Sequence, residues 1–258
     1  MIDINCHLLP CTKEGCGDIS DYIKMVETVK SEGIEKIIAT PCFSQDLADK
    51  MTNESVTNEV DKLNEVLLKK KIDVIIYPGS EISIFPGMDE FFKRKMLISL
   101  NGSRYFLIKL PDKTIPQYTQ RVLFDLRQKG VFPVLANPEK NEQVIKSPEI
   151  LFEIVKLGVH LQVNSRSLIG DFGPQIEKTA WKLIENSFVS FVASGWHLND
   201  EKEYSMKKAY RKFIERFGIT VGQQLFYENP LKVINHDEIM MKEPVKPKKK
   251  GLFGLFGK

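Results

Sequence analysis

The chain has 258 residues, of which 42% are apolar, and a formal net charge of +3. This length supports one large hydrophobic core or at most two small domains. The small net charge does not indicate a nucleic-acid-binding protein. No run of about eighteen apolar residues predicts a membrane span, and the first residues lack the pattern of a secretory signal. We therefore expect a cytoplasmic protein.

Strand-like and helical patterns alternate along the chain. In chain order, the sequence predicts strand 1–5, helix 22–32, strand 36–40, helix 56–68, strand 73–77, strand 105–110, helix 117–129, strand 131–136, helix 148–157, strand 159–163, helix 176–186, strand 188–193 and helices 204–217 and 220–227. Near-continuous apolar strands between amphipathic helices predict a parallel sheet covered by helices. Roughly seven such units favour a closed barrel, although periodicity alone does not distinguish it from an open sheet.

The last residues have a different composition. We expect a single barrel domain over residues 1–240 and a flexible tail over 241–258, rich in Lys, Gly and Phe. Basic residues beside Leu-Phe pairs, from Lys246 to Lys258, are typical of peripheral contact with an anionic membrane. A tail with no membrane role is the alternative, which we favour slightly because the glycines oppose a helix.

The four cysteines, Cys6, Cys11, Cys16 and Cys42, lie in the first sixth of the chain. Their number and place predict reduced thiols and not a disulfide framework. Their spacing does not match a zinc ribbon. No cysteine has an arginine six residues later, which argues against the phosphate loop of a cysteine phosphatase.

Polar residues recur where the predicted strands end, and in parallel barrels functional groups lie at this end. The segments concerned are Asn5-Cys6-His7, Thr40-Pro41-Cys42, Gly79-Ser80-Glu81, Lys109-Leu110-Pro111, Asn137-Pro138-Glu139-Lys140 and Ser194-Gly195-Trp196-His197. Each residue taken alone is also compatible with a plain hydrogen-bonding role.

These segments resemble those of the manganese-dependent tyrosine phosphatases of bacterial capsule and exopolysaccharide systems, within the polymerase-and-histidinol-phosphatase (PHP) superfamily. The resemblance runs from residue 1 to about residue 237 and includes IIATP, YPGSEI, VFPVLANPEKN, FVASGWH and LFYENPLKVI in the same order. It implies a single-domain, distorted (β/α)7 PHP barrel with parallel strands. It also implies a metal site at the mouth formed by the carboxyl ends of the strands.

The resemblance leaves a reduced set of metal ligands. His7, Glu81 and His197 are the residual candidates, with Asn5 as a weak carbonyl ligand and Glu14 as a conservative replacement. The family's ligand is replaced at five positions, namely Asn5, Cys42, Lys109, Asn137 and Gly195. The resemblance therefore implies one divalent ion, manganese or another, or none.

The replacements oppose a multinuclear manganese site, which needs several carboxylates and imidazoles. Cys42 suits softer metals, and Gly195 has no side chain. Lys109 would repel a bound cation, or pair with Glu81 as a substitute positive charge. A solvent-facing Lys109 without a partner is the alternative.

Three cations are candidates for binding a phosphotyrosine or a phosphorylated sugar: Lys109, Lys140 and Arg166. The alternative, to which we give equal weight, is that these three residues are ordinary surface charges. No residue is firmly assigned as catalytic, and His197 and Lys140 are the candidates.

From these losses we expect a catalytically impaired (pseudo)phosphatase that acts as a binding or regulatory protein. Its expected partner is a tyrosine kinase, or the phosphotyrosine tail of a polysaccharide-export system. The alternative is an active metal-dependent phosphotyrosine phosphatase with a reduced site at His7, Glu81 and His197. Another hydrolase activity on the same barrel is a third interpretation. Oligomers are compatible with the family, but no interface is predicted.

Overall fold

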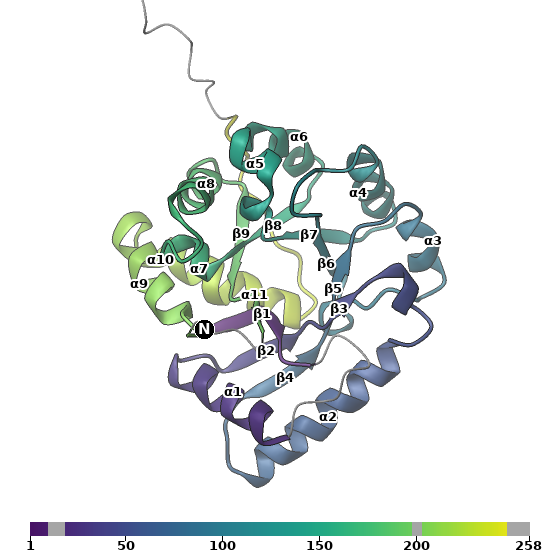
Figure 1. Cartoon of the computed structure of the whole chain (residues 1–258), viewed down its shortest axis with the longest axis vertical. Coiled ribbons are helices and arrows are strands. Elements are labelled where there is room, and N and C mark those ends of the chain that lie inside the picture. The colour runs from purple at the N-terminus through teal and green to yellow at the C-terminus, as the bar shows by residue number, and fades with distance from the viewer. Residues whose placement is uncertain (10–18, 198–202, 247–258) are drawn as a thin grey trace, which may run out of the picture.

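A computed structural model describes residues 1–9, 19–197 and 203–246 (Figure 1). The predictions for Glu14, Cys11 and Cys16 therefore lie outside the described residues. The same holds for the tail beyond Lys246, so its expected membrane contact and the boundary at residue 240 stay predictions.

Ten strands run through the described part of the chain, and all their pairings are parallel. They are β1 (Ile2–His7), β2 (Lys36–Ala39), β3 (Cys42–Phe43), β4 (Ile75–Pro78), β5 (Glu81–Ser83), β6 (Tyr105–Lys109), β7 (Phe132–Ala136), β8 (His160–Asn164), β9 (Val189–Ala193) and β10 (Trp196–His197). One sheet has the order β10-β1-β2-β4 and the other β3-β5-β6-β7-β8-β9. The predicted parallel α/β single domain is confirmed.

Three strands of the distorted barrel are each split in two by a short interruption. The splits separate β2 from β3 at Thr40-Pro41, β4 from β5 at Gly79-Ser80, and β9 from β10 at Ser194-Gly195. In each case the second piece carries a residue of the barrel mouth. The short strands β3, β5 and β10 were not predicted, because pieces of two or three residues are too short to show a periodic pattern.

Helices surround the strands on the outside (Figure 1). They are α1 (Ile19–Ser31), α2 (Asn53–Lys69), α3 (Met88–Lys93), α4 (Thr119–Gln128), α5 (Glu142–Lys146), α6 (Leu151–Lys156), α7 (Ser165–Leu168), α8 (Pro174–Glu185), α9 (Met206–Phe217), α10 (Ile219–Gln223) and α11 (Asn229–Ile234). A π-helical turn, Gln224–Glu228, joins α10 to α11, and short 3-10 turns lie at Gln45–Leu47, Leu100–Gly102, Pro138–Lys140 and Pro148–Ile150.

The long helices begin where local chemistry favours a helix start. In α2, the Thr52 side chain accepts from the Ser55 backbone N–H, and the Ser55 side chain accepts from Thr52 in return. Such a capping box satisfies two backbone donors that a helix leaves unpaired. Pro174 stands in the first turn of α8, where its missing N–H costs nothing. The first predicted helix starts three residues earlier than its apolar pattern indicated.

Buried polar groups hold β1 against β9 where the barrel closes. The Asp3 carboxylate accepts hydrogen bonds from the Ser194 backbone N–H at 3.0 Å and hydroxyl at 2.6 Å, and from the Tyr204 hydroxyl at 2.9 Å. The Gly195 N–H donates to the Asn5 carbonyl at 2.7 Å. Burial raises the pKa of the Asp3 carboxyl, and the hydrogen bonds from these donors offset part of this rise. This closure brings the end of β9 beside the end of β1.

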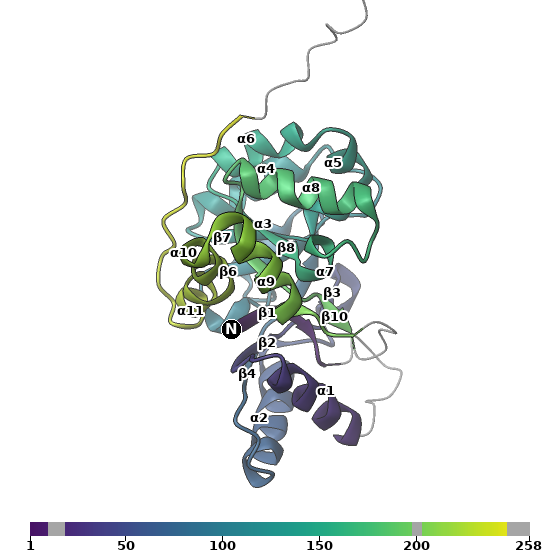
Figure 2. The same ribbon diagram turned by 90° about the vertical axis from the view of Figure 1, so that its left-hand side faces the viewer.

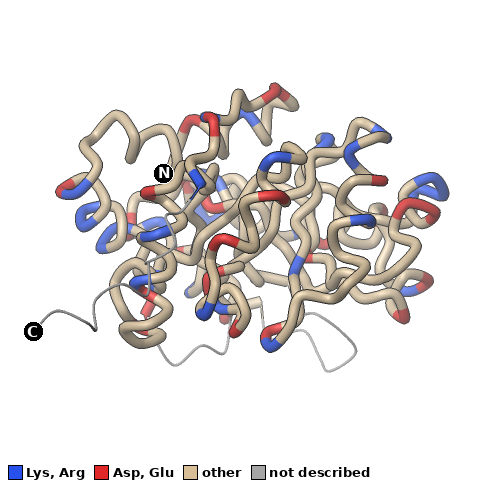
Figure 3. Tube along the Cα trace, turned by 90° about the horizontal axis from the view of Figure 1, so that it is seen from above, with Lys and Arg blue, Asp and Glu red and all other residues tan. Residues whose placement is uncertain are grey.

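The charged residues are interspersed over the described chain. Lys and Arg alternate with Asp and Glu around the trace (Figure 3). Seen from the side, the segment after α11 runs along the outside of the barrel toward α6 (Figure 2). Within the described residues, no helix combines the length and the apolar character that crossing a bilayer requires.

Candidate active site

A polar cavity of about 270 Å³ opens at the carboxyl ends of the strands. Its lining comprises His7, Glu81, Lys109, Leu110, Pro111, Asp112, Ala136, Asn137, Pro138, Lys140, Asn141, Gly195 and His197. These residues end β1, β6, β7 and β10, begin β5, or lie in the segments that follow β6, β7 and β9. The cavity therefore lies where the sequence predicted a site.

Three side chains with metal-binding atoms converge beside this cavity, and two of them, His7 and Glu81, line it. His7, Cys42 and Glu81 each offer one ligand atom, and these atoms lie within 4.8 Å of one another. His7 ends β1, Cys42 begins β3, and Glu81 begins β5. Cys42 and Glu81 are register partners of adjacent parallel strands, and the Glu81 N–H donates to the Pro41 carbonyl at 3.1 Å. The two interrupted strands therefore place both ligand atoms beside the end of β1.

The Glu81 carboxylate is almost fully buried and has three polar neighbours. Its Oε2 atom lies 3.7 Å from His7 Nε2 and 3.8 Å from Lys109 Nζ. Its Oε1 atom accepts a hydrogen bond from Asn5 Nδ2 at 3.3 Å. A buried carboxylate needs such partners, because losing water is costly for a charged group. The contact between Lys109 and Glu81 that the sequence predicted is present, as a long ion pair.

A chain of buried amides extends from Glu81 across the barrel. The Thr40 hydroxyl donates to Asn5 Oδ1 at 3.0 Å, and Asn5 Nδ2 donates to Gln162 Oε1 at 3.0 Å. Gln162 Nε2 in turn donates to Asn137 Oδ1 at 3.1 Å. Asn5 therefore presents its NH2 group, not its oxygen, to Glu81. The Asn5 oxygen, which the sequence predicted as a weak metal ligand, accepts the hydrogen bond from Thr40 instead of facing Glu81.

Gly195 lies against two asparagine side chains, those of Asn137 and Asn164. A Cβ atom added there would stand 2.6 Å from Asn164 Nδ2 and 3.4 Å from Asn137 Nδ2. The backbone at Gly195 has φ +54°, a conformation that other residues adopt only with strain. At this predicted degenerate position, the neighbouring amides occupy the space into which a carboxylate side chain would extend.

His197 stacks on His7 and is not one of the three residues of the cluster. The two imidazole ring centroids are 3.8 Å apart, and the rings are within 6° of parallel. A metal ion lies in the plane of the imidazole that binds it, so two parallel stacked rings do not share one ion. The arrangement therefore separates His197 from the predicted set of His7, Glu81 and His197, and leaves it exposed at the mouth.

Lys140 reaches the cavity from the 3-10 turn after β7, whereas Arg166 does not line it. The Lys140 Nζ atom lies 3.8 Å from the centroid of the Phe172 ring, and Arg166 Cζ lies 4.7 Å from the same centroid. Arg166 is buried and its Nε atom is 3.7 Å from the Asp171 carboxylate. Of the three predicted anion-binding cations, Lys109 and Lys140 share the cavity.

Burial shifts the ionisation of the residues beside this turn. It lowers the pKa of the Lys140 ammonium, and the neighbouring Glu139 carboxylate partly offsets this change. Burial likewise raises the pKa of Glu139, which accepts from the Asn164 N–H at 2.9 Å and the Ser167 hydroxyl at 2.6 Å. Lys140 is therefore an ammonium group with restricted access to water at the edge of the cavity.

Two members of the site were not recognised from the sequence. Cys42 was counted only as a lost ligand, yet its thiol lies 3.6 Å from His7 Nδ1. Gln162 was not singled out, yet it links two of the replaced positions. The available signal for Gln162 was a polar residue inside an apolar strand, HLQVN.

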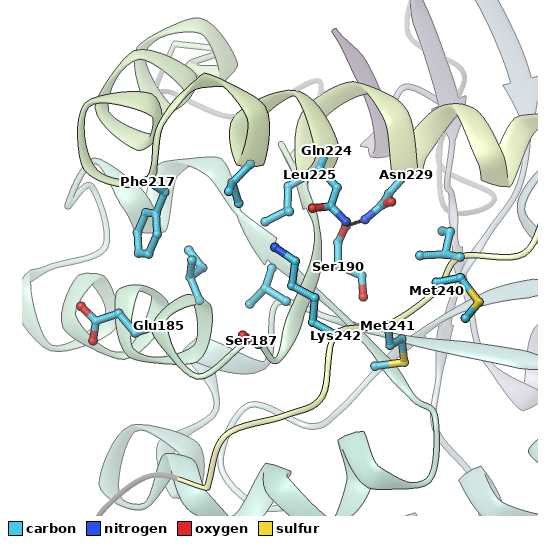
Figure 4. Close-up of a pocket in the computed structure, with 14 residues that line it drawn as sticks. Glu185, Ser187, Ser190, Phe217, Gln224, Leu225, Asn229, Met240, Met241 and Lys242 are labelled. Atoms are coloured by element: carbon cyan, nitrogen blue, oxygen red, sulfur yellow. Dashed lines mark hydrogen bonds between the residues drawn. The ribbon is translucent and has the colours of Figure 1, made fainter.

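A second cavity lies at the opposite ends of the strands. Its lining includes Ser187 and Ser190, near the start of β9, together with residues of α10, the π-helical turn and the segment 239–242. Figure 4 shows Leu225, Met240 and Met241 around it, with the Asn229 amide donating to the Ser190 carbonyl at 2.8 Å. Its lining has the Ser187 and Ser190 hydroxyls but no histidine or cysteine, and Glu185 is its one carboxylate, so it lacks the cluster of metal-ligating side chains found at the first cavity.

Known proteins are similar to this chain over nearly its whole length. The chain is 34% identical over 256 residues to the tyrosine-protein phosphatase YwqE of Bacillus subtilis (strain 168), covering 99% of this chain and 100% of YwqE. It is 24% identical to the tyrosine-protein phosphatase CpsB of Streptococcus pneumoniae, covering 91% and 98% of the two chains.

A solved structure has the same fold. It comes from crystal structures of YwqE from Bacillus subtilis and CpsB from Streptococcus pneumoniae, described as unique metal-dependent tyrosine phosphatases. The match has a TM-score of 0.88 and 33% identity, and covers 96% of this chain and 100% of the other.

These relatives correct the expectation of a catalytically impaired protein. They are named as tyrosine phosphatases, and the structural relative as a metal-dependent one, which supports the active phosphatase and not the pseudophosphatase. The expectation failed because it treated each replaced ligand as a simple loss, whereas the structure brings Cys42 to His7 and Glu81. Residues 1–235 match the family described as capsular polysaccharide synthesis, CpsB/CapC, and the chain belongs to this family.

Proposed function

We propose that this chain is an active, metal-dependent phosphatase that hydrolyses phosphotyrosine in proteins of a capsule or exopolysaccharide system. The observation that carries the proposal is the convergence of His7, Cys42 and Glu81 within 4.8 Å, since two of them, His7 and Glu81, line the same cavity as Lys109 and Lys140. Metal ligands and cations side by side are what hydrolysis of a phosphate monoester requires.

The described residues fit one divalent ion and not a cluster of several. Three ligand atoms and an open position are enough for a catalytic site with one metal. Asn5 and Asn137 are engaged in the amide chain, and Gly195 offers no ligand. When bound, one ion supplies a Lewis acid for the phosphoryl oxygens and a water of lowered pKa.

The lysines of the cavity would bind the phosphoryl group of the substrate. Lys109 and Lys140 both line the mouth, from the end of β6 and from the turn after β7. An ammonium that is kept from water interacts more strongly with an anion than one in bulk solvent. Lys140, whose pKa burial lowers, is therefore the stronger candidate for holding the phosphate.

The remaining lining suits an aromatic leaving group. Leu110, Pro111 and Pro138 form an apolar wall of the same cavity, against which a tyrosine ring can pack. His197 lies exposed at the mouth with its ring parallel to that of His7. We assign His197 the task of giving a proton to the departing phenolate oxygen.

The substrate that we propose is a phosphotyrosine segment of the tyrosine kinase of such a capsule system. This assignment is supported by the family, which functions in capsular polysaccharide synthesis, and by relatives named as tyrosine phosphatases.

Turnover of matched peptides tests this function. We expect a phosphotyrosyl peptide to be hydrolysed with an added divalent ion, and the same peptide with phosphoserine to be hydrolysed far more slowly. Lys140→Met should raise KM for the phosphotyrosyl peptide about tenfold, while the exposed Lys178→Met leaves it unchanged. No turnover of the phosphotyrosyl peptide with any divalent ion, by protein that is folded by circular dichroism, would contradict the proposal.

A further inference from the structure

The ligand atoms at the barrel mouth include a sulfur. Cys42 Sγ lies 3.6 Å from His7 Nδ1, and Glu81 Oε2 lies 3.7 Å from His7 Nε2. The two ring nitrogens of His7 face different partners, so one nitrogen can bind an ion while the other keeps its neighbour and orients the ring. When Nδ1 binds the ion, the Cys42 sulfur lies beside it as a second ligand, and Glu81 is near enough to be the third, because one ligand atom of each residue lies within 4.8 Å of the others.

We propose that His7, Cys42 and Glu81 form a site for a single thiophilic divalent ion, zinc above all, in place of a manganese cluster. The proposal deepens the proposed function, since it names the metal of the same site. A thiolate is a soft ligand that selects zinc or cobalt, whereas manganese prefers carboxylate, carbonyl and water oxygens. Manganese also stands at the weak end of the affinity order for divalent ions with nitrogen and sulfur ligands.

The surroundings restrict the site to one ion. On the side of Asn5, an NH2 group and not an oxygen faces Glu81. The positive charge of Lys109 lies 3.8 Å from the Glu81 carboxylate, where it opposes the addition of further cations. At Gly195, the amides of Asn137 and Asn164 occupy the space that a further ligand side chain would need.

A hydrogen bond is the competing explanation for the contact between Cys42 and His7. Two neutral side chains at 3.6 Å are compatible with a weak sulfur hydrogen bond. The register of β3 and β5 argues for a ligand role, because it places Cys42 directly beside Glu81. A hydrogen bond alone would not require a buried carboxylate at the same point.

Cobalt(II) is the probe that separates these explanations. Metal-free protein in a reducing buffer is titrated with cobalt(II), and the near-ultraviolet sulfur-to-cobalt charge-transfer band is recorded together with the visible bands. We expect the band to saturate at one cobalt per chain. Cys42→Ser should abolish the charge-transfer band. Cys6→Ala should keep it, because Cys6 is a buried thiol next to His7 that is not part of the cluster.

Competition then tests selectivity. Zinc should displace cobalt at about one equivalent, whereas manganese at roughly a hundredfold excess should not. Cys42→Ser should weaken zinc binding by roughly 100-fold or more, since even partners outside the ligand shell typically contribute 10- to 100-fold. A cobalt spectrum without the sulfur band, a band that survives Cys42→Ser, or displacement by manganese as readily as by zinc would overturn the inference.

The same samples separate this inference from the proposed function. If para-nitrophenyl phosphate is hydrolysed in a metal-dependent way while the sulfur band is absent, the phosphatase stands and the zinc site fails. If the band is present but no divalent ion supports turnover, the zinc site stands and the phosphatase fails.

Discussion

The Cys42 thiol lies 3.6 Å from His7 Nδ1, at a position where the family resemblance predicted a lost metal ligand. The contact depends on the break between β2 and β3, which lets Cys42 pair with Glu81 of β5. The metal site that we propose therefore has an altered composition: a cysteine sulfur lies among the candidate ligand atoms, and buried amides stand where the resemblance implied other ligands.

Removing the positive charge beside Glu81 should favour metal binding. In Lys109→Met, the ammonium 3.8 Å from Glu81 no longer competes with a bound cation. Because Lys109 is partly exposed, the expected gain in zinc affinity is modest, about two- to fivefold. The same change should weaken inhibition by inorganic phosphate. Both are measured by titration, with Lys178→Met as the control, and a weaker affinity for zinc in Lys109→Met would contradict the expectation.

A carboxylate at position 195 should not be tolerated in this chain. Gly195→Asp would place its Cβ atom 2.6 Å from Asn164 Nδ2, on a backbone with φ +54°. We expect a loss of about 2–4 kcal/mol in the free energy of unfolding, from strain and crowding together. Urea denaturation measures this loss.

Two further variants separate strain from crowding at position 195. Gly195→Ala should lower the free energy of unfolding nearly as much as Gly195→Asp, since the Cβ atom alone causes both the backbone strain and the close contact. Asn164→Ala in the Gly195→Asp background should recover part of the loss. Unchanged stability in Gly195→Ala would show that the amides do not restrict this position.

A buried histidine should make the protein sensitive to acid. His160 lies among Tyr105, Phe132 and Phe191, and burial, assisted by the charge of Arg127, lowers its pKa to about 3. In the unfolded chain the pKa is near 6.5, so the unfolded state takes up the proton first as the pH falls. His160 therefore removes stability progressively between about pH 6.5 and pH 3, by roughly 1.4 kcal/mol per pH unit within that window.

The change His160→Gln isolates the contribution of His160 to the pH dependence of stability, because glutamine keeps a polar side chain without a titrating ring. Between pH 6 and pH 4, the free energy of unfolding should fall more steeply in the wild-type protein than in His160→Gln. The exposed His236→Gln should retain the wild-type slope. Parallel slopes for wild type and His160→Gln would show that His160 does not carry the acid sensitivity.

The strand and helix pattern allowed the barrel to be predicted, because each long strand is apolar and each long helix has one apolar face. Predicted and observed strands β6 and β7 differ by one residue at one end. Short elements such as α7 and β10 were missed, since their place depends on contacts between distant segments. The strand ends correctly located the cavity that His7, Glu81 and Lys109 line.

The contacts between individual side chains at the site could not be predicted from the sequence. The resemblance identified which ligands are replaced, but the outcome of each replacement depends on neighbours from other strands. Asn5 points its amino group at Glu81 because Thr40 occupies its oxygen. His197 stacks on His7 because β10 pairs with the end of β1 in register. Such arrangements arise only when the barrel closes.

Phosphate release from a phosphotyrosyl peptide tests the central claim most directly. The protein is stripped with a chelator, then supplied with one equivalent of zinc or with manganese, and compared with His7→Ala and Lys178→Met. We predict no release from stripped protein, recovery with zinc, loss in His7→Ala and full activity in Lys178→Met. Equal release from the stripped protein, or undiminished release from His7→Ala, would contradict a metal-dependent phosphatase at this site.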